Sequence, residues 1–510
     1  MNPFFSSLYK QNINNKLRFL KKSESNVFDN VGEQEAIRLF NLVNTQVVAY
    51  KKFLKSSKFN LKKVTSLQDF KKLPLMTKNN YIKQHNLKDL MPPKELANIS
   101  TFSATSGSTG EPTFFPRGEE QDSYYEYMAE VFLVNQFSVS KNKSTLVIIG
   151  FGLGVWIGGI FTYKILNKLA SKGYKISILP VGPQKDMYLK SLKKFGNLFD
   201  QVILAGYPPF IKDVIDESGD YGINWNDYSA KVLTAAEGYS EEFRDYIARK
   251  IKIKNIYTDF VNIYGSVELG TMANETPLAV LIRRLACKNK NIFKLIFDNS
   301  TRLPTLAQYY PYLIYFEEVE NQLVATGYGS SIPLVRYQFA DYGRVISFAE
   351  MVSRFKIIGV NLVEEATKIG IDKTILRLPF VYVYERSDFV VNLMGINIYP
   401  EYIRDGLQKQ DIEKKVTGKF SMITKYDKKH NQFLEINIEL KKGQTKSLKL
   451  LESVKKSLVR SLQSRSTEYN YLYNNSTKAS RKKITPKIIF FNYEDSTYFA
   501  PGAKQKWVIK

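Results

Sequence analysis

The stretch Ser103–Gly118 reads SATSGSTGEPTFFPRG and crowds Ser, Thr and Gly into a run that is neither hydrophobic nor strongly charged. A packed helix or strand would have little use for its glycines, Gly107, Gly110 and Gly118. A backbone that wraps closely around an anion needs residues that tolerate unusual φ/ψ angles and leave amides exposed. The stretch therefore predicts a phosphate-binding loop. It is not a P-loop of the ATPase type, because the Lys and hydroxyl of G-x-x-x-x-G-K-[ST] are absent here.

The composition is that of a globular protein with more than one domain. The chain has 510 residues, of which 44% are hydrophobic and 24% charged. One cysteine, Cys287, and two histidines, His85 and His430, exclude an intramolecular disulfide framework, a thiolate zinc cluster and a His-rich metal site. The first residues lack the pattern of a signal peptide. Together these features predict a cytoplasmic protein.

Residues 144–163, STLVIIGFGLGVWIGGIFTY, are uncharged over about the ~20 residues that span a bilayer. The run is β-rich, then breaks into closely spaced glycines, and ends in a helical pattern. It predicts a strand, a glycine loop and a helix, and no membrane span. A dinucleotide fingerprint is excluded, because Ile157 stands where the third glycine of G-x-G-x-x-G belongs. The apolar residues around Phe151–Gly159 and Tyr207 are candidates for a substrate pocket and equally for core.

The net charge of +25 allows a nucleic-acid binder that would use Lys with Tyr and Phe as stacking platforms. The lysines are scattered, however, and no known binding motif appears, so a solvated surface is the preferred interpretation and no nucleic-acid partner is expected. From Asp388 to the end there are 24 Lys and Arg against 12 Asp and Glu, about half of the excess. This asymmetry predicts an acidic partner for the C-terminal quarter.

Short β-branched runs alternate with helical stretches in the middle of the chain. The run at 143–150, for example, is followed by a helical pattern at 161–173 and a second β-branched run at 175–182. Such alternation predicts parallel strands with crossover helices. A helical region, 1–93, precedes it, and the pattern beyond Asn321 is hairpin-like.

The overall prediction is an α/β protein of two domains. The large N-terminal domain, 1–387, consists of β-sheets flanked by helices. The small C-terminal domain, 388–510, is an α+β unit with strands around an amphipathic helix. Five short segments also stand out for their chemistry: TSGSTGEPT (105–113), TAAEGYSEEFR (234–244), YGSVE (264–268), PLVRYQFAD (333–341) and RSDFVVNLMG (386–395).

In that order, the five segments resemble motifs of the acyl-adenylate-forming superfamily of AMP-dependent synthetases and ligases. The segment DFKKLPLMTKNNY, 69–81, resembles the corresponding part of its phenylacetate-CoA ligase-like branch, so the resemblance covers nearly the whole chain. It implies an ATP- and Mg²⁺-dependent ligase that joins a carboxylic acid to AMP. The acyl group would then pass to the thiol of CoA or of the phosphopantetheine arm of an acidic carrier protein. An amine or protein acceptor is an alternative.

The chemistry explains why such a site needs these residue types. A carboxylate and the α-phosphate of ATP repel each other, so cations and amide donors must offset the repulsion. By the resemblance, Glu268 holds Mg²⁺, Tyr264 stacks on adenine and Asp341 accepts hydrogen bonds from the ribose. The nucleotide-binding residues implied are Thr105, Ser106, Gly107, Ser108, Thr109, Gly110, Ala236, Glu237, Gly238, Tyr264, Gly265, Asp341 and Arg386.

The catalytic residues implied are Lys504, Glu268 and Thr109. A cation about 4 Å from developing negative charge is worth on the order of 4 kcal/mol at an effective dielectric near 20. Lys506 competes with Lys504 for this role, because Ala503 breaks the usual Gly-Lys pairing. In the superfamily the small domain is mobile and turns between two reaction steps about a hinge, which Asp388 would form here.

Three positions depart from the family pattern. Val267 replaces the usual Thr, Glu385 replaces a Gly, and Gly238 stands where Pro is expected. The departures indicate a divergent branch, and they leave open a catalytically impaired relative that acts as a scaffold.

Overall fold

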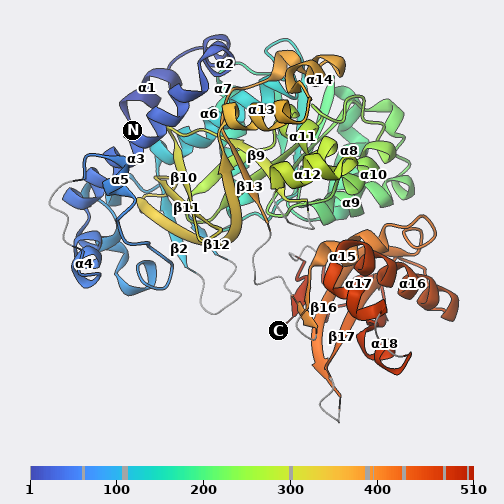
Figure 1. Cartoon of the computed structure of the whole chain (residues 1–510). Helices are drawn as coiled ribbons and strands as arrows, with labels where there is room; N and C mark the ends of the chain where they lie inside the picture. The colour runs from blue at the N-terminus through green and yellow to red at the C-terminus, as the bar shows by residue number, and fades with distance from the viewer. Residues whose placement is uncertain are drawn as a thin grey trace.

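The computed structural model describes residues 2–59, 64–105, 113–297, 303–384, 391–393, 396–427, 432–474, 478–501 and 505–509. Figure 1 shows a larger part, from α1 to β13, and a smaller part below it, from β14 to β19. The larger part is built on an 11-stranded sheet with the order β10-β11-β12-β13-β9-β8-β7-β6-β5-β3-β4. Helices flank this sheet, which confirms the predicted α/β fold class.

One half of the sheet is parallel. Strands β4, β3, β5, β6 and β7 pair in parallel, as the alternation of β-branched and helical runs predicts. A separate antiparallel sheet of two strands, β1 (Thr101–Ala104) and β2 (Phe114–Arg117), precedes this half. The elements of the parallel half are α6 (Glu119–Asn135), β3 (Thr145–Ile149), α7 (Ile157–Ser171), β4 (Ile176–Leu179), α8 (Lys185–Phe195), β5 (Gln201–Gly206), α9 (Pro208–Glu217), β6 (Ala230–Ala235), α10 (Glu241–Lys250) and β7 (Phe260–Ser266).

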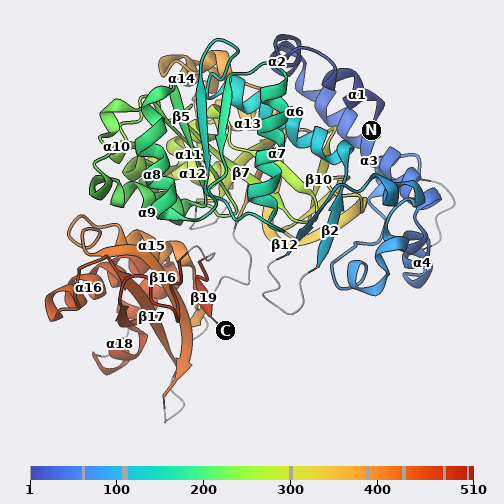
Figure 2. The same ribbon diagram turned by 180° about the vertical axis from the view of Figure 1, so that it is seen from behind.

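Side chains of the parallel strands alternate between two helical layers. In β3, Leu146 and Ile148 pack in a core with α8, α9 and α10. Val147 and Ile149 of the same strand pack with α6 and α7, on the face seen in Figure 2. All five residues of β3 are buried, as expected for a parallel strand covered on both faces. The run 144–163 is therefore a strand, a loop and a helix, as predicted.

Within the described ranges, no helix combines the length and the apolar character needed to cross a membrane.

The other half of the sheet is antiparallel. Strands β10 and β11 form a hairpin whose two loop residues, Glu320 and Asn321, have positive φ angles of 52° and 63°. The hairpin-like prediction beyond Asn321 misses two helices, α13 and α14, whose buried faces share a core with α11 and α12. The elements are β8 (Gly270–Asn274), α11 (Pro277–Lys288), α12 (Lys290–Phe297), β9 (Thr305–Tyr309), β10 (Ile314–Val319), β11 (Gln322–Gly327), β12 (Leu334–Ile346), α13 (Phe348–Ile357), α14 (Leu362–Lys368) and β13 (Phe380–Val383).

The N-terminal region is helical, as predicted. Several helices begin at side-chain caps: Asn2, Asn12 and Ser66 each accept a hydrogen bond from a backbone N–H of the first turn. This region packs in one core with strands of the antiparallel half. Its elements are α1 (Pro3–Tyr9), α2 (Ile13–Lys22), α3 (Ser25–Gln46), α4 (Val48–Ser56), α5 (Leu67–Phe70) and the 3₁₀ helices η1 (Ile82–Gln84), η2 (Leu87–Leu90) and η3 (Pro93–Asn98).

The smaller part has its own hydrophobic core, formed by residues from Val391 to Val508. Its main sheet has the order β18-β17-β16-β19, with helices α15 and α16 packed together. The predicted boundary between 387 and 388, and the hinge at Asp388, lie outside the described residues and stay predictions. The elements are β14 (Val391–Leu393), β15 (Ile396–Ile398), α15 (Pro400–Leu407), β16 (Val416–Tyr426), β17 (Gln432–Leu440), α16 (Leu448–Arg465), α17 (Thr467–Asn474), α18 (Lys478–Ile484), β18 (Lys487–Phe491) and β19 (Val508–Ile509).

Candidate active site

The two ends of the predicted phosphate loop are held together at Thr105. The Thr105 N–H donates to the Thr113 carbonyl at 3.0 Å, and the Thr113 N–H donates to Thr105 Oγ1 at 3.0 Å. Lys78 Nζ also donates to Thr105 Oγ1, at 3.3 Å. The predicted loop residues Ser106, Gly107, Ser108, Thr109 and Gly110 lie outside the described residues.

Lys78, which lies within the segment 69–81, has no role among the predicted site residues. Its neighbour Met76 pairs with β12: the Met76 N–H donates to the Arg336 carbonyl at 3.0 Å, and the Gln338 N–H donates to the Met76 carbonyl at 2.8 Å. Arg336, which has a positive φ of 49°, donates to Glu317 at 3.1 Å and to the Leu73 carbonyl. These bonds fix the segment that carries Lys78 to the strand that carries Asp341.

Tyr264 and Asp341, the predicted adenine and ribose residues, are brought together. The Tyr264 hydroxyl donates to Asp341 Oδ2 at 2.7 Å, although β7 and β12 are not neighbours in the sheet. Both side chains are half-buried, so each presents part of its surface to solvent. The Tyr264 ring stacks at 6.4 Å on Phe316, which supports one face of the phenol. The pairing places two predicted contacts at one location, while their roles stay predictions.

Glu268 lies in the turn between β7 and β8. Gly265 is required there, because a Cβ on it would stand 2.5 Å from the Gly270 carbonyl oxygen. Behind the turn lies a fully buried cation, Arg117, which donates to the Val267 carbonyl. Burial lowers the pKa of the Arg117 guanidinium to about 10, against the opposing charges of Glu268 and Asp122. The turn is thus fixed from within the protein.

The carboxylate of Glu268 fits a Mg²⁺ ion that is held mainly by phosphates. This residue is only 7% exposed, and among the described residues no group of three or more His, Cys, Asp or Glu is arranged so that it could hold a metal ion by itself. Mg²⁺ is usually bound through one or two carboxylates together with water and substrate phosphates. One carboxylate is therefore a sufficient protein contribution when the nucleotide supplies the phosphates.

The predicted segment Ala236–Gly238 follows β6 and is held by side chains of the larger part. Ala236 has a positive φ of 75°, which an L-residue rarely adopts. The Asn262 amide donates to the Glu237 carbonyl at 3.1 Å. Buried Arg283 donates to the Tyr239 carbonyl at 2.6 Å and forms an ion pair with fully buried Glu275. This network holds the backbone of the segment in its strained conformation.

The C-terminal end of the chain contacts the same segment. Trp507 Nε1 lies 3.3 Å from Glu237 Oε2, and Arg404 of α15 donates to the Gly238 carbonyl at 3.3 Å. Of the competing lysines, Lys506 is exposed beside Trp507. Lys504 lies outside the described residues, as do the predicted Arg386 and Asp388.

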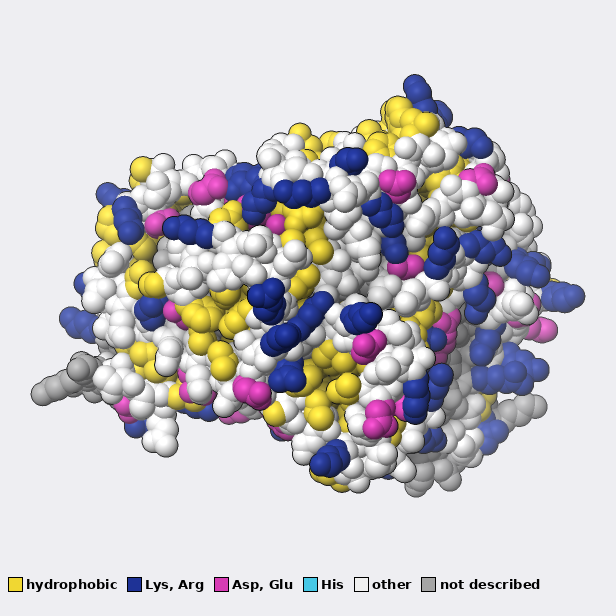
Figure 3. Space-filling model, turned by 90° about the horizontal axis from the view of Figure 1, so that it is seen from above, with side chains coloured by type: hydrophobic (Ala, Val, Ile, Leu, Met, Phe, Trp, Pro, Cys, Tyr) yellow, Lys and Arg dark blue, Asp and Glu magenta, His cyan; other side chains and the backbone are white. Residues whose placement is uncertain are grey.

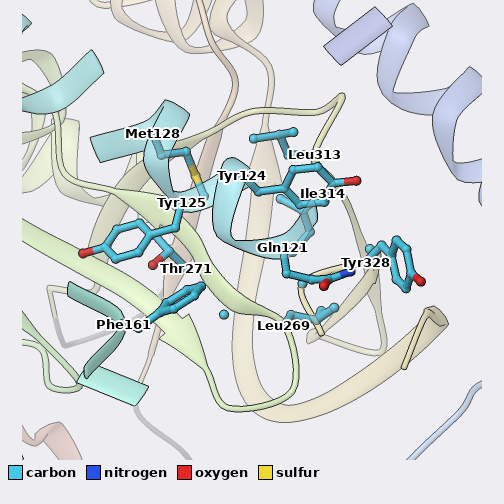
Figure 4. Close-up of a pocket in the computed structure, with 13 residues that line it drawn as sticks. Gln121, Tyr124, Tyr125, Met128, Phe161, Leu269, Thr271, Leu313, Ile314 and Tyr328 are labelled. Carbon is cyan, nitrogen blue, oxygen red and sulfur yellow. The ribbon is translucent and has the colours of Figure 1, made fainter. Parts of the chain in front are cut away.

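A cavity lies just beyond Glu268, between α6, α7 and β8 (Figure 4). Its lining is aromatic and aliphatic, with Phe161 and Leu269 among the side chains, and is not formed by the predicted Phe151–Gly159 and Tyr207. Gln121 adds a polar group: its Oε1 accepts from the Gly118 N–H at 2.8 Å. Gln121 is only 2% exposed, and its Nε2 has no hydrogen-bond partner among the described residues.

The basic surface is dispersed on the face shown in Figure 3, where Lys and Arg alternate with Asp, Glu and apolar side chains. This distribution agrees with a solvated surface.

No family model matches the sequence, and no curated protein does. Solved structures do match. A 2-hydroxyisobutyryl-CoA ligase in the postadenylation state with 2-HIB-AMP has a TM-score of 0.66 and 13% identity, over 97% of this chain and 91% of that one. The same ligase in its thioesterification state, with 2-HIB-AMP and CoA, has a TM-score of 0.52 over 96% and 91%. The acyl acid amido synthetase AtGH3.15 with 2,4-DB has a TM-score of 0.59 and 12% identity, over 98% and 94%.

These likenesses confirm the predicted fold, which is that of the acyl-adenylate-forming ligases. The narrower assignment to the phenylacetate-CoA ligase-like branch stays a prediction.

Proposed function

We propose that this protein is an ATP-dependent, AMP-forming carboxylate ligase that makes an acyl-adenylate and passes the acyl group to a thiol. The observation that carries the proposal is the contact between Tyr264 and Asp341 at 2.7 Å. It unites two predicted nucleotide contacts from separate motifs on separate strands. In this proposal, Thr105 at the base of the loop and Glu268 in the turn between β7 and β8 contact the triphosphate.

In the first step, a carboxylate oxygen attacks the α-phosphorus of ATP, the bond from that phosphorus to the bridging oxygen breaks, and pyrophosphate leaves. Thr105 and the loop after it would bind the phosphates, with Lys78 supplying positive charge at the base of the loop. Glu268 would hold Mg²⁺, which supplies further positive charge to the phosphates when bound. Lys504 would stabilise the charge that develops between the acid and the α-phosphate.

In the second step, a thiolate attacks the acyl carbon and AMP leaves. We place the thiol on CoA or on a carrier-protein phosphopantetheine, since the basic smaller part suits an acidic partner. The higher TM-score to the postadenylation state than to the thioesterification state supports an arrangement suited to the first step. The second step would then require the smaller part to turn, with Asp388 as the hinge. The single cysteine supports a cytoplasmic location.

An amine acceptor is a second candidate, favoured by the match to AtGH3.15, an amido synthetase. Incubating the enzyme with ATP, its acid and either CoA or an amino acid decides between them, because one product is a thioester and the other an amide.

We place one small polar group of the acid, not the whole acyl chain, in the cavity beyond Glu268, whose volume of about 20 Å³ is close to that of one water. The unpartnered Gln121 Nε2 would donate to an oxygen on the acid, so an acid with a hydroxyl or carbonyl group should be preferred over its plain hydrocarbon analogue. Gln121→Leu should remove most of that preference, measured as the ratio of kcat/KM for the two acids. An unchanged ratio would mean that the cavity holds water instead.

The test of the proposed function is acid-dependent exchange of labelled pyrophosphate into ATP, screened over aryl, fatty, hydroxy and amino acids. At least one acid should stimulate exchange, and Asp341→Ala should raise the KM for ATP. ATP binding without exchange for any acid would favour the scaffold alternative, and salt-sensitive binding of random oligonucleotides would favour the nucleic-acid alternative.

A further inference from the structure

Trp507 is held firmly within the smaller part. Its side chain is 4% exposed and its ring centroid lies 4.7 Å from that of Phe420. The Trp507 carbonyl accepts from the Met422 N–H at 2.7 Å, and the next residue, Val508, pairs with Met422 in a parallel ladder. The indole therefore moves with β16 as one body.

The polar edge of this indole meets the larger part. Trp507 Nε1 lies 3.3 Å from the Glu237 carboxylate, and the Arg404 guanidinium lies 4.7 Å from the indole ring centre. Arg404 also donates to the carbonyl of Gly238. Two stacked side chains of the smaller part thus contact consecutive residues of the predicted nucleotide segment. The contact joins positions 270 residues apart in the chain.

Trp507 is three residues away from Lys504. A chain extends by at most about 3.3–3.6 Å per residue, so a residue three positions away stays within roughly 10 Å of the anchored backbone. Fixing Trp507 against Glu237 therefore raises the local concentration of the terminal lysine at the site.

We propose that Trp507 is a positioning residue for the adenylation step: its indole N–H docks on Glu237 and sets the location of the segment that carries Lys504. This inference rests on the proposed function. The docked contact belongs to the arrangement that activates the acid, and it must open when the smaller part turns for acyl transfer. Trp507 therefore supports adenylation and is dispensable for thioester formation.

Trp507→Phe tests this role, because phenylalanine keeps the ring next to Phe420 and loses the N–H. Losing a hydrogen bond to a charged group predicts a fall in kcat for pyrophosphate exchange of about tenfold, with the KM for ATP within about twofold of wild type. Thioester formation from synthetic acyl-adenylate should be unchanged. The matched control is Trp225→Phe, which removes an indole N–H bonded to Ser218 in the larger part and should leave both steps unchanged. Equal loss in the two half-reactions would overturn the proposal.

A double-mutant cycle shows whether Trp507 acts through Lys504. If it does, adding Trp507→Phe to Lys504→Ala should reduce exchange no further than Lys504→Ala alone. Losses that multiply would contradict the positioning role. Arg404→Met is a second variant, for use if Trp507→Phe disturbs folding; it leaves the indole in place and should also lower exchange more than acyl transfer.

The docking contact has a readout that does not depend on activity. A protein with Trp156→Phe and Trp225→Phe keeps Trp507 as its single tryptophan. Replacing Glu237 by Leu in this protein should shift the Trp507 emission, because the indole loses its charged partner. An unchanged spectrum would overturn the docking contact. A shifted spectrum in a wild-type protein without acid-dependent exchange would uphold the contact and contradict the proposed function.

Discussion

The two parts of the molecule meet the candidate site in different ways. In the larger part, the site segments are fixed by buried side chains bonded to backbone carbonyls: Arg117 at Val267 and Arg283 at Tyr239. The smaller part reaches the site through Trp507 and is joined to the larger part mainly by ion pairs. Backbone bonds of this kind give one fixed geometry, whereas ion pairs can separate into water. The difference agrees with the prediction that the smaller part turns, although Arg404 and Lys212 also donate to carbonyls across the interface.

One group of these ion pairs lies between α9 and β16, and others join Lys185 to Glu494 and Arg465 to Glu242. Lys419 Nζ lies 2.6 Å from Asp213 of the larger part and 3.5 Å from Glu439 of its own part. Burial alone would lower the pKa of Lys419, but these two carboxylates outweigh it and raise the pKa. Lys212 Nζ donates to the Thr417 carbonyl at 2.7 Å from the other side. Water can hydrate both partners of each contact once they separate. Contacts of this kind would allow the smaller part to turn.

The largest effect, on the free energy of unfolding, is expected from a substitution of Arg336 in the larger part. Its ion pair with Glu317 is almost fully buried, and removing one partner of such a pair costs about 3–5 kcal/mol. Arg336→Met should lower the unfolding free energy of the larger part by that amount in urea. The double variant Arg336→Met, Glu317→Leu should recover much of the loss. An effect below about 1 kcal/mol would show that this strand is not held by Arg336.

A smaller effect is expected from a change of pH in the smaller part. Burial raises the pKa of Asp405 to about 6, although Arg465 lies 2.7 Å away. Because this value lies above that of an unfolded aspartate, the folded protein binds the extra proton. The contribution of Asp405 to stability should therefore be largest below about pH 4 and fall by about 3 kcal/mol as pH rises through 6.

Unfolding of the smaller part by urea between pH 4 and pH 7 measures this decline. Asp405→Asn should flatten the pH dependence of the unfolding free energy over that range. An equal slope in the variant would exclude Asp405 as its source.

The smallest effect is expected at the interface itself. Asp213→Asn removes one interdomain charge and leaves the Lys419 pair with Glu439 intact, so about 1 kcal/mol of docking should be lost. Pyrophosphate exchange should fall several-fold and become less sensitive to added salt than in wild type. Asp220→Asn, at an exposed position of the same part, is the control. Identical salt dependence in Asp213→Asn and wild type would contradict an ionic interface.

Much of the fold follows from local sequence. The parallel strands are short, fully apolar runs such as β3, whose burial on both faces leaves a continuous hydrophobic signal. Helices α13 and α14 were not predicted. Only two residues of each helix are buried, and they pack into a core assembled from distant segments. The pairing of Tyr264 with Asp341 was anticipated only through the family resemblance.

The supporting residues of the site could not be predicted in this way. Arg117 contacts a carbonyl 150 residues away, and Arg336 contacts one 263 residues away. Neither position carries a local pattern that distinguishes a buried arginine from an exposed one. Lys78 was quoted within a family segment, but its place beside Thr105 depends on the pairing of Met76 with β12. Such contacts are properties of the folded chain.

The most direct test of the central claim, that this site activates a carboxylate with a lysine from the C-terminal end, is pyrophosphate exchange in two matched variants. Lys504→Ala should lower the acid-dependent exchange rate by about 10²–10³-fold, the size expected for losing one group that stabilises transition-state charge. Lys506→Ala, a change of the same kind at an exposed neighbour, should stay within about threefold of wild type. Exchange that survives both substitutions, alone and combined, would contradict the account.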